Sequence, residues 1–209
     1  MKHNFQLMLD KTIANIAYRE SKPRLLLHAC CAPCSSYVLE YLSKIFDITL
    51  LFFNPNISPS AEYETRKAEL YKLVADMELN DVVHFEDADY QPELFLEIAK
   101  GLELAPEGGE RCKKCYELRL RETAKRARNG GYDYFTTTLS ISPYKNAEWL
   151  CEIGGRLSEE FEVEYLYSDF KKRNGYKRSC ELSEQYGLYR QDYCGCAYSR
   201  LERQRIKDK

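Results

Sequence analysis

Short apolar runs alternate with longer segments of helical periodicity along most of this chain. The runs expected to form strands are residues 25–29, 48–53, 82–85, 134–139 and 163–167. The segments expected to form helices are residues 35–45, 60–79, 92–101, 112–128 and 146–157. Strands that alternate with helices pair in parallel, because each helix carries the chain back along the sheet. The sequence therefore predicts an α/β fold, a three-layer parallel sheet with helices on both faces.

Turn-forming residues mark the ends of several of these elements. Asn54-Pro55-Asn56 stops the second strand, and Ser58 or Ser60 is the expected N-cap of the long helix that follows. No internal repeat, low-complexity segment or linker divides the chain. We therefore expect a single catalytic domain over residues 1–209.

The size and composition of the chain limit the roles that its cysteines can have. A chain of 209 residues with 44% apolar content is large enough to bury a core without disulfide cross-links. It shows neither a secretory leader nor an apolar run of about 18 residues, so we expect a cytoplasmic protein without membrane contact. In a reducing compartment, closely spaced cysteines usually bind metal or cycle as catalytic disulfides.

Seven of the nine cysteines fall into three tight groups. The groups are Cys30, Cys31 and Cys34, then Cys112 and Cys115, then Cys194 and Cys196. Such grouping is typical of metal ligands or of redox-active thiols. Cys151 and Cys180 stand alone in helical segments, and we expect both to be packed core thiols.

The first group lies between the first predicted strand and the helix after it. In a parallel sheet, binding sites form at the carboxyl ends of the strands. Free backbone N–H groups and the positive end of the helix lower thiol pKa values there. Pro33 suits the first turn of the helix, where its missing N–H has no intrahelical partner. The first group is therefore a predicted ligand site.

The second group, Cys112-x-x-Cys115, opens a basic helix. This spacing occurs in both zinc and iron–sulfur sites. Zinc ribbons pair two such motifs, whereas the partner here is the adjacent pair Cys30-Cys31. Adjacent side chains diverge, which suits the corners of a cubane better than a single ion. The pattern favours iron–sulfur over zinc and leaves both open.

The third group, Cys194-Gly195-Cys196, is the tightest. Two cysteines one residue apart close a strained disulfide only if the residue between them is permissive, as glycine is. Strained disulfides are readily reduced. The motif therefore predicts a redox-active pair, and metal ligation by one of the two sulfurs is the competing interpretation.

The motifs together resemble the QueH family of epoxyqueuosine reductases. They are His28-x-Cys30-Cys31-x-Pro33-Cys34, Cys112-x-x-Cys115, Thr138-Leu139-x-x-Ser142-Pro143-Tyr144-x-Asn146, Asp169-Phe170-Lys171-Lys172 and Tyr189-Arg190-Gln191-x-Tyr193-Cys194-Gly195-Cys196. The resemblance implies reduction of epoxyqueuosine to queuosine at the wobble position of tRNA. It also implies a fold similar to the adenine-nucleotide hydrolase and PP-loop (HUP-like) group. The chain lacks that group's phosphate loop, so ATP use is not expected.

The resemblance also implies roles for individual residues. Cys30, Cys31, Cys112 and Cys115 would be the ligands of a [4Fe–4S] cluster, and Cys194 and Cys196 would be the redox-active pair, carried by a C-terminal segment at about 168–209. Cys34 would lie in the same site, as a ligand of a second, mononuclear iron or as a catalytic thiol. Because a cluster supplies one electron at a time, a dithiol or second metal is a sensible partner for a two-electron reduction. The electron donor is not identified.

Loss of the epoxide oxygen as water needs a proton donor, and an anticodon loop needs a binding surface. The candidate donors are Asp87, Asp89, Tyr144 and Tyr193. Loop bases stack on aromatic or guanidinium planes, while Lys and Arg hold phosphates. The residues expected to form this surface are Tyr144, Lys145, Lys171, Lys172, Arg173, Tyr176, Arg190, Tyr193 and Arg200.

Two other classes of protein remain open. A zinc-binding RNA adaptor would use its cysteines structurally, and its local basic patches would contact phosphates despite the net charge of −2. A metal-free thiol oxidoreductase would need only Cys194 and Cys196. Neither accounts for all three cysteine groups together with the Ser142-Pro143-Tyr144 motif.

Overall fold

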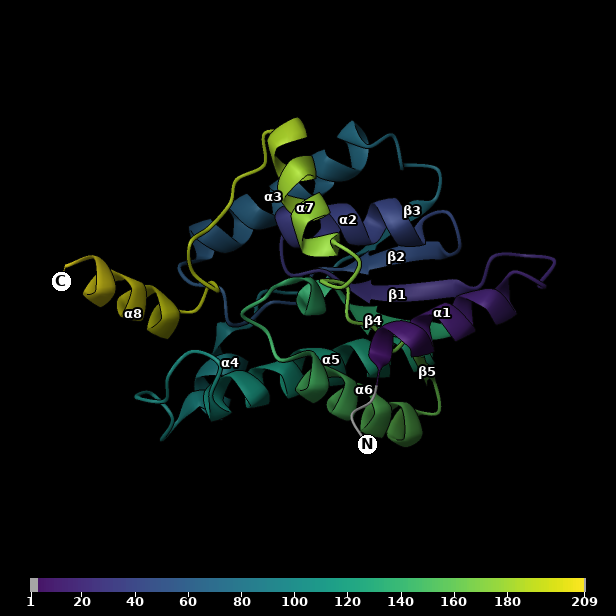
Figure 1. Ribbon diagram of the computed structural model, residues 1–209. Helices are drawn as coiled ribbons and strands as arrows, with labels where there is room; N and C mark the ends of the chain where they lie inside the picture. Colours follow the sequence, from purple (N-terminus) through teal and green to yellow (C-terminus); the bar gives the residue numbers. More distant parts are fainter. Residues whose placement is uncertain (1–3, 209) are drawn as a thin grey trace.

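A computed structural model describes residues 4–208, so residues 1–3 and 209 of the expected domain lie outside it. The strands are β1 (Arg24–His28), β2 (Asp47–Leu51), β3 (Val83–Glu86), β4 (Tyr134–Thr137) and β5 (Glu164–Tyr165). The helices are α1 (Phe5–Ile16), α2 (Ala32–Leu42), α3 (Ser60–Asp76), α4 (Pro92–Ala99), α5 (Glu110–Asn129), α6 (Ala147–Phe161), α7 (Gly175–Gln185) and α8 (Ala197–Lys207), with a 3₁₀ turn η1 (Thr138–Ile141). Figure 1 shows their arrangement.

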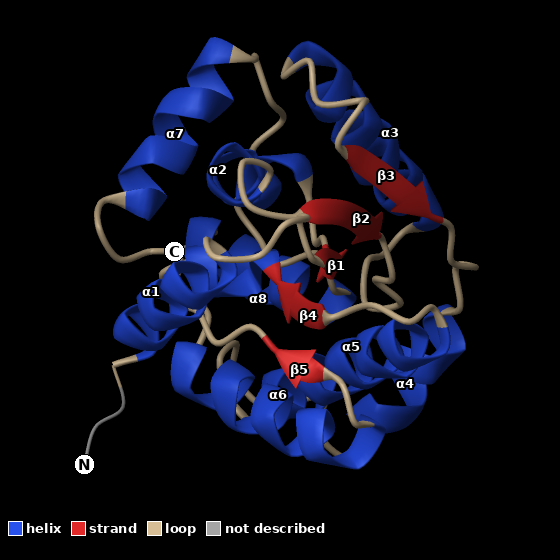
Figure 2. Ribbon diagram, turned by 90° about the vertical axis from the view of Figure 1, so that its right-hand side faces the viewer, coloured by secondary structure: helices blue, strands red, loops and turns tan. Residues whose placement is uncertain are grey.

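The five strands form one parallel sheet in the order β3-β2-β1-β4-β5. Helices α2, α3 and α7 lie on one side of the sheet, and α4, α5 and α6 lie on the other (Figure 2). The expected three-layer α/β fold is confirmed. The strand order reverses between β1 and β4, and in sheets of this kind ligands bind beyond the carboxyl ends of the strands at that point.

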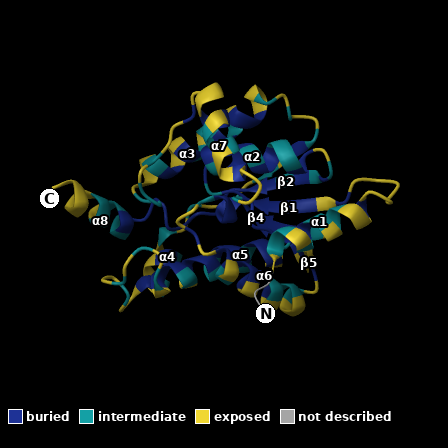
Figure 3. Ribbon diagram, viewed as in Figure 1, coloured by how far each residue is buried: buried dark blue, intermediate teal, exposed yellow. Residues whose placement is uncertain are grey.

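The sheet is buried on both faces. Successive β1 side chains point to opposite sides, so Leu25 and Leu27 join the core beneath α2 and α3, whereas Leu26 joins the core beneath α5 and α6. All three leucines are fully buried. The central strands β1, β2 and β4 are mostly buried, and the exposed residues lie mainly on the outer surfaces of the helices and in loops (Figure 3).

Several element ends differ from those predicted. β4 ends at Thr137, because the chain turns into η1 and the Thr137 hydroxyl accepts a hydrogen bond from the Leu139 N–H at 3.1 Å. Neither Ser58 nor Ser60 caps α3. Its N-cap is Pro59, whose carbonyl accepts hydrogen bonds from the first turn. The predicted N-cap was therefore wrong by one residue.

The periodicity missed α1 and α8, and α7 was expected only as an unbounded helical segment around Cys180. α1 lies before the first strand, and α8 extends away from the body of the molecule at the C-terminal end (Figure 1). α8 is mostly polar and buries only Ser199 fully, so it carries little apolar periodicity. Across residues 4–208, none of the helices is both long and apolar enough to cross a membrane.

Candidate active site

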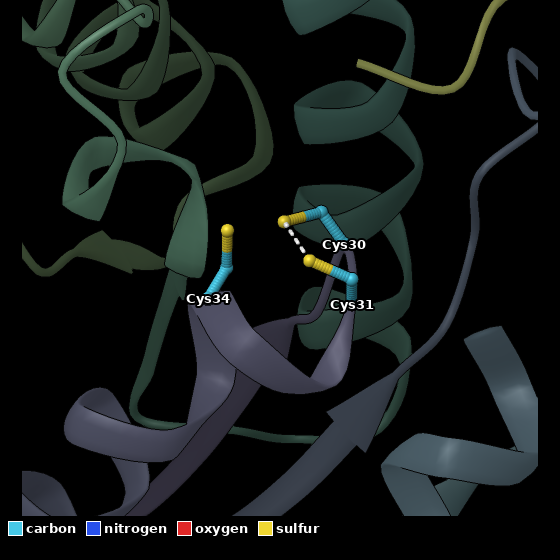
Figure 4. A group of neighbouring side chains, drawn as sticks. All are labelled: Cys30, Cys31 and Cys34. Atoms are coloured by element: carbon cyan, nitrogen blue, oxygen red, sulfur yellow. Dashed lines mark hydrogen bonds between the residues drawn. The ribbon is translucent and has the colours of Figure 1, made fainter. Parts of the chain in front are cut away.

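The first cysteine group gathers where β1 gives way to α2. Cys30 and Cys31 follow the end of β1, and Cys34 lies in the first turn of α2. The sulfur atoms of the three residues lie within 4.8 Å of one another, and those of Cys30 and Cys31 are 3.8 Å apart. Figure 4 shows the three side chains directed into the same space. Among the described residues, this is the one group of three or more Cys, His or acidic side chains close enough to share a metal ion.

The turn that carries these sulfurs is held by the neighbouring strand ends. The Asn54 side-chain amide, just after β2, donates to the Ala29 carbonyl at 2.8 Å. The Thr138 hydroxyl, just after β4, accepts from the Cys30 N–H at 3.3 Å and donates to the Cys30 sulfur at 3.5 Å. Three strand ends thus fix one loop. As predicted, Pro33 occupies the first turn of α2.

The three sulfurs differ in acidity. Hydrogen bonds from Cys31 and Cys34 hold the pKa of Cys30 well below its usual value. The pKa of Cys34 is raised because its thiol is hydrogen-bonded to Cys30 and Cys31 and because it is buried. Cys30 is therefore the most acidic thiol of the group. Its lowered pKa comes from hydrogen bonds of neighbouring side chains, whereas the pKa values of Cys31 and Cys34 are raised.

His28, the last residue of β1, is a structural residue. Its Nδ1 lies 2.8 Å from the Thr137 hydroxyl and its Nε2 lies 3.1 Å from the Phe53 carbonyl oxygen. The carbonyl is only an acceptor, which assigns the proton to Nε2. Burial, with a contribution from Arg119, lowers the pKa of His28 to about 3. The neutral ring ties the ends of three strands together.

The second group lies on one face of α5. Cys112, Cys115, Tyr116 and Arg119 are spaced i, i+3, i+4 and i+7, so they share a face of the helix, and all four are buried. The Cys112 sulfur accepts a hydrogen bond from the Gly108 N–H at 3.3 Å. Burial raises the pKa of Cys115 to about 12.

The third group lies against the second. Cys196 packs with Cys115 in a small apolar cluster, and the Cys194 sulfur interacts electrostatically with both Cys112 and Cys115. The Cys196 sulfur caps α8 by accepting from the Ser199 N–H at 3.4 Å. All nine cysteines, these two included, are free thiols.

Arg66 and Ser58 hold the backbone of the third group in place. The Arg66 Nη1 donates to the Cys194 carbonyl at 3.1 Å, and the Ser58 N–H donates to the Gly195 carbonyl at 2.9 Å. Gly195 has a φ of +123°, which L side chains rarely adopt, and a Cβ there would meet Arg66 Nη1 at 3.0 Å. Gly195, which the sequence analysis expected to permit a disulfide, is therefore also required by the backbone conformation between the two cysteines.

A cavity of about 330 Å³ opens beside these groups. Its walls include Cys30, Cys31, Cys34 and Cys194, whereas the buried Cys112 and Cys115 do not line it. Of the residues expected to bind substrate, the ones that line it are Tyr144, Lys145, Tyr176, Arg190 and Tyr193. The structure therefore brings members of the first and third groups to one cavity with most of the expected substrate residues.

Other expected residues lie elsewhere. Lys171, Lys172 and Arg173 line a second cavity, which shares only Lys145 with the first. Neither Asp87 nor Asp89 lines the first cavity, and Asp87 is exposed and paired with Lys67 at 2.9 Å. Arg200 does not line it either.

The two single cysteines differ from each other. Cys151 is a core thiol as predicted, fully buried, with its sulfur 3.6 Å from the Ser168 carbonyl. Cys180 is only half-buried and belongs to none of the buried apolar clusters of the described chain. The prediction of a core thiol was wrong for Cys180, because α7 turns that position partly toward solvent.

Three arginines of the site were missed by sequence reasoning. Arg66, Arg119 and Arg203 all line the cavity. Arg119 could have been found, since it lies seven residues after Cys112 and four after Cys115 and so shares their helix face. Arg66 and Arg203 come from α3 and α8, and only tertiary packing brings them here.

The described residues fit a metal–thiolate group. Thiolates are ligands for zinc and for iron–sulfur clusters, and such a group carries sulfur atoms that accept hydrogen bonds. Behind the cysteines, the Tyr116 hydroxyl and the Arg119 Nη2 are buried and have no hydrogen-bond partner among the described residues. Buried donors without partners are uncommon. The cysteine ligands and the two unpaired hydrogen-bond donors both suit a metal–thiolate group bound at this position.

Comparison with known proteins agrees with the site. The family model of the epoxyqueuosine reductase QueH matches residues 25–202. The chain is 43% identical to the epoxyqueuosine reductase QueH of Streptococcus pyogenes serotype M1 over 201 residues, covering 95% of this chain and 78% of the relative. It is 42% identical to the QueH protein of Staphylococcus epidermidis (96% of this chain, 86% of the relative) and 36% identical to that of Thermotoga maritima (86% and 91%). The chain belongs to the QueH family of epoxyqueuosine reductases, a family of oxidoreductases.

Proposed function

We propose that this chain reduces epoxyqueuosine to queuosine at the wobble position of tRNA, with an iron–sulfur cluster and a redox-active cysteine pair. One observation carries the proposal: sulfurs from the first and third cysteine groups line one cavity at the point where the strand order reverses. That cavity is the place where the fold favours ligand binding. Family membership supplies the reaction and the substrate.

The [4Fe–4S] ligands in this proposal are Cys30, Cys31, Cys112 and Cys115. The two pairs belong to one region, because Cys30 packs against the apolar cluster that includes Cys112. When bound, the cluster supplies single electrons to the site. Cys34, whose sulfur lies within 4.8 Å of those of Cys30 and Cys31, is proposed as a ligand of a second, mononuclear iron or as a catalytic thiol.

Cys194 and Cys196 have different parts in the proposed redox pair. Cys194 lines the cavity in which the substrate would bind. Cys196 is buried, and its sulfur is engaged as the cap of α8. We assign the thiol that meets the substrate to Cys194 and the second thiol of the pair to Cys196.

The departing oxygen needs a proton, and the cavity offers tyrosines for this role. Asp87 and Asp89 do not reach the cavity, whereas Tyr144 and Tyr193 line it. Burial and the nearby Glu62 raise the pKa of Tyr193, so its hydroxyl stays protonated and able to donate. We assign the proton donor to Tyr193.

The mouth of the cavity suits a nucleotide. Tyr144 is 65% exposed, and the Arg203 guanidinium lies 5.8 Å from its ring centroid. Exposed aromatic and guanidinium planes stack on unpaired bases, and the guanidinium charge also attracts phosphates. We propose that these two residues, with Tyr176 and Arg190, hold the anticodon loop.

The first experiment is to purify the protein without oxygen and to measure iron, zinc and acid-labile sulfide together with the visible spectrum. The proposal expects a brown protein with about four irons and four sulfides per chain, and an additional iron if Cys34 holds one. Dithionite-driven reduction of epoxyqueuosine in tRNA is then assayed for the wild type and for Cys112→Ser, Cys194→Ser and Cys180→Ser.

The variants separate the assigned roles. Cys112→Ser should lose sulfide and activity, Cys194→Ser should keep sulfide and lose activity, and Cys180→Ser should keep both. Zinc without sulfide in the wild type would overturn the cluster assignment and favour a zinc-binding RNA adaptor. Full activity without bound metal would favour a metal-free thiol oxidoreductase.

A further inference from the structure

One face of α5 carries two buried polar groups whose donors are unused. Tyr116 and Arg119 are each 1% exposed and lie on the same face as Cys112 and Cys115. The Tyr116 hydroxyl and the Arg119 Nη2 have no partner among the described residues. A buried unsatisfied donor costs about 1–3 kcal/mol. Two unpaired donors on one helix face indicate an acceptor that the described residues do not supply.

The positive charge of Arg119 is a second and stronger reason to expect an acceptor at this position. Its Nε donates to the Cys115 carbonyl at 3.2 Å and its Nη1 to the Asn54 side-chain oxygen at 3.4 Å, and both partners are neutral. Of the 20 salt bridges within residues 4–208, none involves Arg119. A buried cation without a counter-charge is strongly unfavourable. Thiolates of the cysteine site would supply that counter-charge to Arg119, which lines the cavity with Cys30 and Cys194.

Arg119 lies among members of all three cysteine groups. It lines the cavity together with Cys30 and Cys194, and its Nε donates to the Cys115 carbonyl. Tyr116 stands beside it, with the guanidinium 5.9 Å from the ring centroid, and belongs to the same buried cluster as Cys112. Arg66 flanks the site from α3, but Glu62 already balances its charge at 2.7 Å. Arg119 is thus the central uncompensated cation of the site.

We propose that Arg119 and Tyr116 are positioning residues that set the reduction potential of the metal–thiolate group, Arg119 through its charge and Tyr116 as a neutral hydrogen-bond donor to sulfur. The inference rests on the proposed function, since it requires that the cysteines hold a redox-active group. Reduction adds negative charge, which a nearby cation and hydrogen bonds to sulfur stabilise. Removing either group therefore makes the midpoint potential more negative.

The test is a potentiometric titration of the anaerobically purified, metal-loaded protein, followed by electron paramagnetic resonance. Arg119→Met removes the charge, Arg119→Lys keeps it, and Tyr116→Phe removes only the hydroxyl. The matched control is Lys125→Met, which removes one positive charge from an exposed position on the same helix. Iron and sulfide content and the thermal unfolding midpoint are measured for every variant.

Arg119→Met should lower the equilibrium constant for one-electron reduction at least tenfold, which is about 59 mV. Tyr116→Phe should shift the potential in the same direction by less, Arg119→Lys should retain most of the wild-type potential, and Lys125→Met should leave it unchanged. If Arg119→Met does not fold, the shift expected for Tyr116→Phe still tests the inference.

Two failures are distinguishable. A wild type without iron and sulfide contradicts the proposed function itself, and this inference with it. If the wild type is loaded and Tyr116→Phe has the same potential, as does Arg119→Met where it folds, this inference alone is contradicted. A lower unfolding midpoint with an unchanged potential shows a structural role and also overturns it.

Discussion

Gly195 shows how one residue fixes the geometry of the third cysteine group. Its φ of +123° is accessible mainly to glycine, and a side chain there would press on Arg66 Nη1 and on Ile57, both within 3.1 Å of the added Cβ. We predict that Gly195→Ala costs about 1–3 kcal/mol locally and misplaces Cys194 and Cys196. Thermal unfolding, and the rate at which the two thiols form a disulfide under diamide, measure the two effects.

Gly101→Ala is the matched control for that substitution. Gly101 also has a positive φ, of +75°, but a Cβ there meets no atom within 4 Å. It should share the backbone cost without changing the rate of disulfide formation. Equal rates for wild type and Gly195→Ala would contradict the role assigned to Gly195.

Cys34 is the cysteine whose role a single substitution defines. Its sulfur lies with those of Cys30 and Cys31, yet it is not among the four proposed cluster ligands. If it holds a second iron, Cys34→Ala should lose about one iron per chain and most of the activity while its sulfide content stays unchanged. Iron and sulfide analysis, with Cys180→Ala as the control, checks this. Parallel loss of iron and sulfide would make Cys34 a cluster ligand instead.

At the scale of elements, α7 is held against α2 by a close approach and an ion pair. Gly175 begins α7 where a Cβ would lie 2.5 Å from the Tyr37 ring, so only glycine allows this approach. The Glu40 carboxylate accepts from Arg178 at 2.6 and 3.0 Å. This docking matters for the site because α7 supplies Tyr176 and Ser179 to the cavity wall.

The Glu40–Arg178 pair predicts a pH-dependent contribution to stability. The hydrogen bonds from Arg178 hold the pKa of Glu40 below its usual value of 4.5, so the folded state binds fewer protons than the unfolded chain. The stabilisation is therefore complete above about pH 4.5 and is lost as the pH falls through the lower folded-state pKa. Because both side chains are partly exposed, Glu40→Gln should cost less than about 1 kcal/mol at pH 7.

Urea unfolding of wild type and Glu40→Gln at several pH values measures this contribution. The difference in the free energy of unfolding should shrink toward zero as the pH is lowered below 4.5. Glu181→Gln, which removes a partner of Arg178 within α7 itself, is the control and should have a smaller effect at pH 7. A difference that grows on acidification would contradict the assignment.

At the scale of the whole molecule, the cavity mouth is assembled from distant parts of the chain. Tyr144 follows η1, Arg190 follows α7 and Arg203 belongs to α8. α8 is tied back to the body where the Glu107 N–H donates to the Glu202 carboxylate at 3.0 Å. Substrate binding should therefore depend on residues that no single segment supplies.

Binding of a tRNA with a queuosine-type anticodon should respond differently to the two kinds of residue at this mouth. Arg203→Met should weaken binding and reduce the slope of log affinity against log salt by about 1, since one phosphate contact is lost. Tyr144→Ala should weaken binding about tenfold or more with the slope unchanged, since stacking is lost. Fluorescence anisotropy at several salt concentrations measures both.

The control for RNA binding is Arg156→Met. Arg156 is an exposed residue of α6, paired with Glu117 and outside the cavity. It should leave both affinity and slope near those of the wild type. Equal weakening by all three substitutions would mean that binding is nonspecific.

The order of the elements and the cysteine groups could be predicted from the sequence because both are local. A buried strand shows as an apolar run, as Leu25-Leu26-Leu27 does, and a ligand group such as Cys30, Cys31 and Cys34 shows as close spacing in the chain. The helices for which this reasoning gave no bounds, α1, α7 and α8, pack against parts of the chain that are distant in sequence or extend away from them. Leu9 of α1, for instance, is buried in the core that Leu25 joins from β1.

By itself, the sequence determined the α/β fold class, the three cysteine groups and the resemblance that names the family. Only the tertiary structure decided which groups meet, that Arg66 and Arg203 join them, that Asp87 does not, and that the Arg119 Nη2 has no hydrogen-bond partner among the described residues. The physical reason is the distance along the chain over which each kind of information acts. Periodicity and motif spacing act over a few residues, whereas a buried charge is balanced by whatever packing brings within a few ångströms, and packing is a property of the whole chain.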